Sequence, residues 1–324
     1  MSMKEIIISK LKNLKKKYSL IEDKKWNLRA LSIAINSIEK YDGEIINGNQ
    51  MKNDLKGIGE KIAKRIDEIL ETGNLKELIE DNDDEKLNED YLENLLLITG
   101  VGNVRAKKWL SLNIKNIDDV KNAITNSKIT STHHIDIGIK YYYDFQKKIP
   151  RTEIDEIKNF LKISLQKMNK DFIFEICGSY RRGALESGDI DVLISNSNYI
   201  DNIESQKFLE KIIKELTKSK LIIDHLTSKG STKFMGVCKV SDIARRIDIR
   251  VINYESYYAA LIYFTGSKNF NVYIRNKALE KNYSLNEYAL TDMKDNSIKI
   301  LNSEEEIFEI LKIPYLPPIE RNID

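Results

Sequence analysis

The sequence has few features of secreted, disulfide-linked or membrane proteins. Its two cysteines, Cys177 and Cys238, lack the spacing of a metal site, so both are predicted to be buried thiols of a protein in a reducing compartment. No apolar run approaches the about 18 residues of a membrane span, and residues 1–17 are too rich in lysine for a secretory signal. These absences predict a soluble intracellular protein without contact to a membrane. They do not decide between nucleus, cytoplasm and virion.

An overall excess of positive charge is also missing. The formal net charge is +2, so a nucleic-acid-binding surface, if there is one, must be local. The distribution is uneven: residues 1–30 hold nine Lys or Arg against three acidic residues, whereas residues 81–93 hold seven acidic residues and one Lys. The basic run at 15–17, taken alone, is more typical of a solvated helix face than of a DNA contact.

The 324 residues are enough for two or three domains, and the pattern of apolar residues changes along the chain. Residues 1–80 have the three- and four-residue spacing of helices, 81–90 read as an acidic linker, and helical patterns resume from 91 to 148. From 151 onward we expect an α+β unit, followed by a smaller mixed segment from about 254. The elements expected in that unit are helices at 153–168 and near 205–218 and strands at 172–177, 189–195, 233–240 and 245–252.

A weak internal repeat links two glycine turns. LKGIGEKIAKRI (55–66) and ITGVGNVRAKKWL (98–110) share an apolar-x-Gly-apolar-Gly pattern followed by a basic helix. The glycines Gly57, Gly59, Gly100 and Gly102 permit tight turns that leave backbone N–H groups free at the next helix start. Such a turn can bind a phosphate without reading a base, so the two copies predict a pair of helix-hairpin-helix motifs on a DNA backbone.

The stretch CGSYRRGALESGDIDVLI (177–194) carries the strongest chemical signal. Asp189 and Asp191 point to one side of an expected strand, while the isoleucines and the valine that alternate with them point to a core. Two adjacent carboxylates repel each other, and a divalent cation removes that conflict. Asp248, in the apolar strand RRIDIRV, offers a third carboxylate and makes a two-metal site feasible.

The residues before this aspartate pair complete the pattern. Gly178 and Ser179 end the strand FIFEIC, and Ser179 is expected to cap the short helix YRRGAL. The start of that helix, with Ser179 and Arg182, is suited to a triphosphate. A strand, Gly-Ser, a short helix and Asp-x-Asp in this order indicate the nucleotidyltransferase superfamily.

The chain resembles the family X DNA polymerases from about residue 25 to its end. The resemblance is densest in GSYRRGALESGDIDVLI, LTSKGSTKFMGVC, RRIDIR and YYAALIYFTGSKNFNVYIRNKALEKNYSLNEYAL. It implies an α+β protein in which an all-helical N-terminal domain precedes a nucleotidyltransferase palm with fingers and thumb subdomains. The implied division is a helical lyase-like DNA-binding domain at 1–85, a duplex-binding helical subdomain at 86–150, the catalytic palm at 151–253 and a nucleotide-selecting subdomain at 254–324.

The resemblance also implies roles for individual residues. Asp189, Asp191 and Asp248 would hold two Mg²⁺ ions, for which Mn²⁺ may substitute, and Asp248 would help to activate the primer 3′-OH. The implied nucleotide-binding residues are Lys148, Ser179, Arg182, Ser187, Gly188, Tyr263, Phe264, Gly266 and Asn271, and those for the template strand and closure are Arg250, Arg275, Glu287 and Tyr288. The implied DNA-backbone contacts are Gly57, Gly59, Lys61, Gly100, Gly102 and Lys233, with a monovalent cation at the hairpin turns.

Departures from the family pattern qualify these roles. Lys148 and Lys268 replace an arginine and an acidic residue, and Arg65 stands where lyase-active relatives carry the nucleophilic lysine. A guanidinium stays protonated and cannot attack an abasic sugar, although it can bind a 5′ phosphate. The expected pocket also contains Lys61 and Lys64, of which Lys64 is expected to face solvent. No BRCT-like region precedes residue 25, and no phosphoesterase domain follows. His133 and His134 are expected in a surface loop without a metal, because the sequence shows no ligand cluster there.

The sequence therefore predicts a template-directed DNA polymerase that fills short gaps during repair, with doubtful 5′-deoxyribose phosphate lyase activity. Its substrates would be gapped or nicked DNA and deoxynucleoside triphosphates. Deoxynucleotides would be preferred because the turn at 263–266 would crowd a ribose 2′-OH. The protein would act as a monomer, with unknown repair partners. The short SDIA loop and Tyr263-Phe264 favour templated synthesis. The alternatives are a template-independent nucleotidyltransferase and a non-catalytic DNA-binding scaffold.

Overall fold

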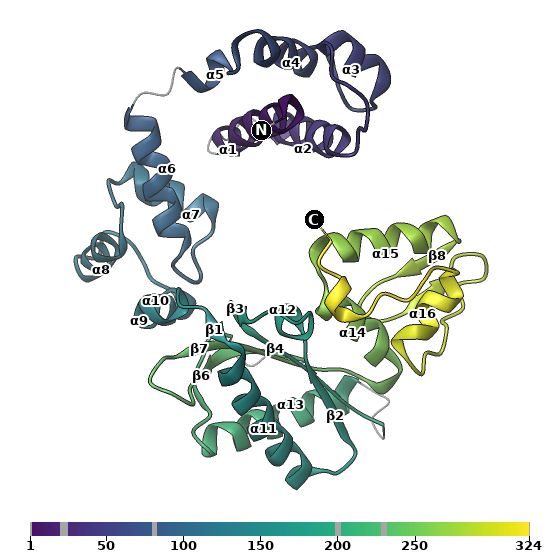
Figure 1. Ribbon diagram of the computed structural model, residues 1–324. Coiled ribbons are helices and arrows are strands. Elements are labelled where there is room, and N and C mark those ends of the chain that lie inside the picture. The colour runs from purple at the N-terminus through teal and green to yellow at the C-terminus, as the bar shows by residue number, and fades with distance from the viewer. Residues whose placement is uncertain (1, 20–24, 80–82, 198–201, 228–231, 324) are drawn as a thin grey trace. The chain divides into compact units, whose positions relative to one another are not determined.

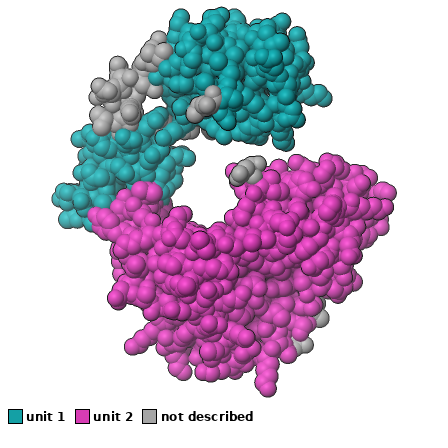
Figure 2. Space-filling model, in the orientation of Figure 1, with its two compact units in different colours: residues 1–96, 101–129 teal, residues 97–100, 130–324 magenta. Residues whose placement is uncertain are grey.

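The computed structural model divides into two compact units (Figure 2), each described by itself. Unit 1 comprises residues 1–96 and 101–129, and unit 2 comprises residues 97–100 and 130–324. The structure describes residues 2–19, 25–79, 83–197, 202–227 and 232–323. Within these residues, no helix is both long enough and apolar enough to cross a membrane.

The described elements of unit 1 are all helices, and the first of them bury an apolar core. These first helices pack through Ile7, Leu11, Leu31, Ile66 and other aliphatic side chains that are fully buried. The close approach of two helices at Gly48 leaves no room for a Cβ, which would lie 2.0 Å from the carbonyl oxygen of Ala63. The helices are α1 (Met3–Ser19), α2 (Lys25–Glu39), α3 (Gly48–Asp54), α4 (Glu60–Thr72), α5 (Lys76–Ile79), α6 (Asp83–Leu96), α7 (Asn103–Ser111) and α8 (Ile117–Thr125).

The elements that the structure describes in residues 1–80 are helices, as predicted, and α4 ends at Gly73, whose φ of +72° is the left-handed conformation that glycine adopts without strain. One expectation for unit 1 needs correction. The expected linker at 81–90 is helical from Asp83 onward, as part of α6, while residues 80–82 lie outside the described residues. Carboxylates are favourable in the first turn of a helix, so an acidic run can begin a helix instead of forming a linker.

Unit 2 is built on a five-stranded sheet, as the α+β pattern predicts. Its order is β2-β4-β7-β6-β5, with β4 and β7 parallel and the other neighbours antiparallel. Figure 1 shows α11 and α13 over one face of this sheet, where their aliphatic side chains form a core with the strands. The large strands are β2 (Phe172–Ile176), β4 (Ile190–Asn196), β5 (Ile222–His225), β6 (Lys233–Cys238) and β7 (Arg245–Val251), and the two helices are α11 (Arg151–Met168) and α13 (Asn202–Lys218).

The opposite face of the sheet is covered in part by α14 (Tyr257–Thr265). Leu193 of β4 and Cys177 pack there against Tyr257, Ala260 and Leu261. Both cysteines are buried free thiols, as predicted. The other helices are α9 (His133–Lys140), α10 (Tyr142–Phe145), α12 (Gly178–Arg181), α15 (Lys268–Glu280) and α16 (Glu304–Leu311), with 3₁₀ turns at Tyr254–Ser256 and Pro318–Glu320. Two small two-stranded sheets pair β1 (Ile149–Pro150) with β3 (Glu186–Ser187) and β8 (Tyr283–Leu285) with β9 (Leu290–Asp292).

Three details of unit 2 differ from the sequence predictions. Strand β5 has no counterpart among the predicted strands, because its four residues are too few for a clear periodicity. Ser179 does not cap α12: the cap position is Cys177, and Ser179 lies within the helix. His133 and His134 begin α9 instead of lying in a loop, and His134 is half-buried.

Candidate active site

Three carboxylates meet on the face of the sheet opposite α11 and α13. Side chains alternate along β4 and β7, so the isoleucines and valines enter the core and the residues between them face outward. The parallel register of the two strands pairs Asp191 with Asp248, and Asp189 immediately precedes β4. Because adjacent strands lie about 4.8 Å apart, this register brings the two paired carboxylates to the same patch of sheet.

The electrostatics of this patch favour a bound cation. Burial, followed by the negative charges of Asp189 and Asp248, raises the pKa of Asp191 to about 7. Two basic side chains pair with the other two aspartates: Lys233 Nζ lies 3.2 Å from Asp248 Oδ2, and Arg246 Nη2 donates to Asp189 Oδ2. The donor set consists of carboxylate oxygens, the ligands that hard divalent cations prefer. The site therefore fits a divalent metal.

Gly178 is required by the position of Asp191. A Cβ at residue 178 would lie 2.7 Å from Asp191 Oδ2, and the φ of +58° is a conformation that favours glycine. Immediately after it, Ser179 Oγ donates to Ser187 Oγ at 2.9 Å, which brings together two of the predicted phosphate-binding residues. Gly188 follows on an open surface, since an added Cβ would meet nothing within 4 Å.

Arg182 joins the short helix α12 to the C-terminal part of unit 2. Its Nη1 donates to the carbonyl of Thr265 at 2.6 Å, and its Nε donates to Asn322 Oδ1 at 2.8 Å. Gly266 makes room for this contact, because a Cβ there would lie 3.3 Å from Arg182 Nη1. Lys148, the other predicted phosphate-binding cation, is exposed just before β1, whose Ile149 pairs with Ser187.

A buried ion network also holds α12 in place. Glu304, at the start of α16, accepts hydrogen bonds from Arg181 at 3.0 and 2.6 Å and from Arg321 Nη1 at 2.7 Å. Arg181 also donates to Thr265 Oγ1. The guanidinium of Arg321 lies over the ring of Phe270 and is fully buried. This network ties the segment that carries Ser179 to the C-terminal elements.

Tyr263, Phe264 and Asn271, which are predicted to line the nucleotide, lie close together. Asn271 Nδ2 donates to the carbonyl of Tyr263 at 2.8 Å, and the two aromatic rings pack edge to face. Arg250 lies with its guanidinium 4.7 Å from the centre of the Phe264 ring, and a small crevice there is lined by Asp191, Asp248, Arg250 and Phe264. This crevice connects the aromatic pair to the carboxylates.

The residues predicted to respond to closure form a second group. Arg275 lies 5.2 Å from the centre of the Tyr263 ring and forms an ion pair with Glu287, with 3.9 Å between Nη2 and Oε2. Tyr288 is exposed. Glu287, which the resemblance implies as a residue of closure together with Arg250, is therefore paired with Arg275 in this structure.

The two glycine turns have the same backbone conformation. Gly57 and Gly100 have φ values of +94° and +91°, while Gly59 and Gly102 are the N-cap residues of α4 and α7. Neither cap position makes a side-chain cap hydrogen bond, so no side chain of the cap residue covers the start of either helix. The repeat in the sequence is a repeat in structure.

The region of the predicted lyase pocket contains a buried ion pair. Arg65 is 4% exposed; its Nε and Nη2 donate to the two carboxylate oxygens of Glu77 at 2.8 and 3.0 Å, and Nη2 also donates to Tyr18 at 2.7 Å. The hydrogen bond from Arg65 keeps the pKa of Glu77 low despite burial, and the charge of Lys61 contributes. Lys61 and Lys64 are exposed. A 5′ phosphate would therefore have to compete with the Glu77 carboxylate for Arg65.

Several residues of the site were absent from the sequence prediction. Arg246 could have been found, because it shares a strand face with Asp248 at a spacing of two. Lys233, predicted as a DNA-backbone contact, forms an ion pair with Asp248 in this structure. Glu304 gave no signal, since its partner Arg181 is 123 residues away in sequence, and Arg321 belongs to the site only through Glu304.

Family models match nearly the whole chain in sequence order. The matched models are a helix-hairpin-helix domain over residues 4–75, the fingers domain of DNA polymerase lambda over 93–146, the DNA polymerase beta palm over 148–254 and the DNA polymerase beta thumb over 260–322. These matches confirm the predicted fold class. The four-part division by residue number stays a prediction.

Curated relatives agree with these matches. DNA polymerase lambda of Rattus norvegicus is 31% identical over 98% of this chain, and DNA polymerase lambda of Arabidopsis thaliana is 30% identical over 90%. DNA polymerase IV of Saccharomyces cerevisiae is 27% identical over 99%. The chain spans 56% and 57% of the length of the two lambda relatives. The carboxylate patch, the paired hairpin turns and these relatives together show that the chain belongs to the family X DNA polymerases.

Proposed function

We propose that this protein is a template-directed DNA polymerase that fills short gaps in DNA repair. It adds a deoxynucleotide to a primer 3′-OH and releases pyrophosphate, acting as a monomer on gapped or nicked DNA. The observation that carries the proposal is the register of β4 and β7, which pairs Asp191 with Asp248 on one face, next to Asp189. A scaffold protein would gain nothing from three converging carboxylates, whose repulsion costs stability.

The three aspartates would hold two Mg²⁺ ions, with Mn²⁺ as a substitute. Asp189 and Asp191 would contact both ions, and Asp248 the one nearer the primer. When bound, such ions lower the pKa of the attacking hydroxyl and neutralise charge on the leaving pyrophosphate. Lys233 and Arg246, which pair with Asp248 and Asp189, limit the repulsion between the carboxylates in the metal-free protein.

The triphosphate would bind beside the short helix α12. Ser179, Ser187 and Gly188 offer hydroxyl and backbone donors on one surface, and Arg182 and Lys148 offer positive charge. Sugar and base would lie against Tyr263, Phe264, Gly266 and Asn271. The hydrogen bond between Asn271 and the Tyr263 carbonyl supports this proposal, because it fixes the backbone turn that would exclude a ribose 2′-OH.

Nucleotide binding would be coupled to an exchange of arginine partners. Arg275 is paired with Glu287 and Arg250 lies over Phe264 in this structure. On closure, Arg275 would reach the template strand, which frees Glu287 and Tyr288 to receive Arg250. The Arg275–Glu287 ion pair is partly exposed, so breaking it costs little.

The DNA would be gripped by the glycine turns. Gly57 and Gly59 form the first turn, Gly100 and Gly102 form the second, and each turn leads into a helix without a side-chain cap; Lys61 adds charge beside the first turn. A monovalent cation held at these turns would supply positive charge for a DNA phosphate. Lyase activity would be absent or weak, because Arg65 cannot form a Schiff base and is already paired with Glu77.

Extension of a primer across a one-nucleotide gap tests this function. The assay compares a gapped duplex with the same primer lacking a template, at equal Mg²⁺, and each of the four deoxynucleotides is supplied singly. Incorporation of the complementary nucleotide on the gap, and none without template, is the expected result. Equal addition without template would assign the chain to template-independent nucleotidyltransferases, and no addition in either case would leave a DNA-binding scaffold.

A further inference from the structure

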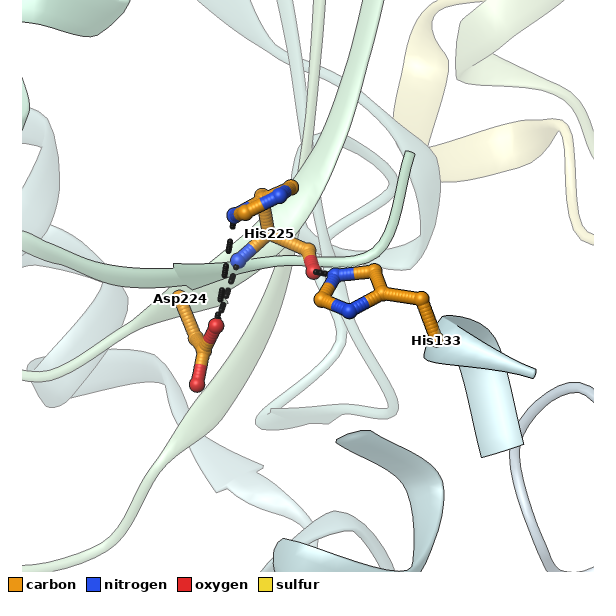
Figure 3. A group of neighbouring side chains, drawn as sticks. All are labelled: His133, Asp224 and His225. Carbon is orange, nitrogen blue, oxygen red and sulfur yellow. Dashed lines mark hydrogen bonds and ion pairs between the residues drawn. The ribbon is translucent and has the colours of Figure 1, made fainter. Parts of the chain in front are cut away.

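A second group of potential metal ligands lies in unit 2 away from the three aspartates. His133, Asp224 and His225 each offer one ligand atom, and these atoms all lie within 4.8 Å of one another. His133 begins α9, whereas Asp224 and His225 end β5 (Figure 3). The chain has three histidines, and the structure brings two of them, 92 residues apart in sequence, to one point.

The hydrogen bonds of the cluster leave ligand lone pairs available. His133 Nε2 lies 2.6 Å from the backbone carbonyl oxygen of His225. A carbonyl only accepts, so Nε2 carries the proton and Nδ1 of the neutral ring retains its lone pair. Metal-ligating histidines commonly donate their other ring N–H to a carbonyl or carboxylate in this way. The two imidazole rings lie face to face at an angle of 35°, with centroids 4.5 Å apart.

The carboxylate is oriented by its own contacts. Asp224 Oδ2 accepts from Lys140 Nζ at 2.8 Å and from Tyr141 at 3.3 Å, and Oδ1 lies 4.0 Å from Nδ1 of His225. Lys140 thus holds Oδ2, while Oδ1 accepts from the backbone N–H of His225 and lies on the side of the His225 imidazole.

The elements that carry the three ligands are fixed by packing. Ile137 of α9 is buried against Leu226, which follows β5, Val237 of β6 and Ala244, which precedes β7. The imidazoles themselves are exposed, and the side chain of His225 is 56% exposed. Tetrahedral ligands of Zn²⁺ lie about 3.3 Å apart, so contraction by up to about 1.5 Å from the present separations of at most 4.8 Å would complete the geometry.

We propose that His133, Asp224 and His225 bind one divalent transition-metal cation of the Zn²⁺ class and thereby join α9 to β5. Two imidazoles and a carboxylate suit Zn²⁺, whereas Mg²⁺ prefers oxygen ligands alone. Three protein ligands leave a fourth position to water, on the solvent side. His134, the next residue, lies against Gly100 of the second hairpin turn, so the cation would anchor a segment that adjoins this turn.

Calorimetric titration of Zn²⁺ into the tag-free full chain tests the site, in excess Mg²⁺ so that the three aspartates are occupied. We expect one Zn²⁺ per chain, and a loss of affinity of at least about 100-fold in His133→Ala and in His225→Ala. His134→Ala is the matched control, since it removes the remaining histidine and should change the affinity less than about threefold. Equal melting temperatures in EDTA would show that the variants are folded.

A measurement on the wild-type chain makes the test independent of these variants. Zn²⁺ should shift or broaden the imidazole C–H proton resonances of His133 and His225 at one equivalent, while those of His134 stay in place. Zn²⁺ affinity unchanged in both His133→Ala and His225→Ala would overturn the proposal. An unperturbed pair of imidazole signals at one equivalent of Zn²⁺ would overturn it as well.

Discussion

Replacing Glu304 by alanine is expected to destabilise unit 2 more than any nearby surface change. Glu304 accepts three hydrogen bonds from Arg181 and Arg321, and its side chain is 5% exposed. Removing one member of a buried ion pair leaves an uncompensated charge and costs about 3–5 kcal/mol. Here two guanidiniums lose their partner, and Arg321 is fully buried, so we expect the upper half of that range.

Urea unfolding followed by fluorescence measures this loss. With a slope of about 1–3 kcal/mol per molar urea, the midpoint of the unit 2 transition should fall by at least about 1 M in Glu304→Ala. Glu304→Gln keeps the shape and one acceptor oxygen, so its loss should be smaller, about 2 kcal/mol. Glu309→Ala, on the exposed side of α16, is the control and should stay within about 0.5 kcal/mol of wild type. A midpoint in Glu304→Ala equal to that of the control would refute the account of the network.

Three further outcomes follow from the site. Gly178→Ala should lower the rate of nucleotide addition about 100-fold, because its methyl group displaces the Asp191 carboxylate; Gly188→Ala, measured in parallel by single-turnover kinetics, should lose far less. The Mg²⁺ concentration for half-maximal rate should rise about tenfold for each pH unit below pH 7 and should level off above pH 7. The reason is that a proton competes with the cation once the pH falls below the raised pKa of Asp191. A flat profile from pH 6 to 8 would contradict this. Borohydride should trap little or no adduct between wild-type protein and an incised abasic site, and Arg65→Lys should increase trapping; a strong adduct with wild type would show that another lysine acts as nucleophile.

The local parts of the site could be predicted because their geometry follows from spacing. Alternation along a strand places Asp191 opposite the core-facing residues, and two glycines two positions apart define each hairpin turn. Strong periodicity in residues 153–168 predicts α11 almost to the residue. These features depend on a few neighbouring residues, which a sequence shows directly.

The remaining features depend on contacts between distant residues. Glu304 is an ordinary acidic residue at a helix start until the fold brings Arg181 and Arg321 to it. The imidazole cluster is divided between residues 133 and 225, so no spacing rule could join its members. Arg65 illustrates a third limit. The sequence shows that its guanidinium cannot act as a nucleophile, but the ion pair with Glu77 depends on how α4 packs on its neighbours, which the sequence does not show.

The most direct test of the central claim measures binding and chemistry together in Asp248→Ala. Fluorescence anisotropy on a one-nucleotide gap reports binding, and rapid quench of the same samples with Mg²⁺ and the complementary deoxynucleotide reports addition. Asp242→Ala, an exposed carboxylate in the preceding loop, is the control. The account predicts that Asp248→Ala binds the gap within about threefold of wild type, because binding depends on backbone contacts elsewhere, and adds no nucleotide. Nucleotide addition by Asp248→Ala at a rate near that of Asp242→Ala would contradict it.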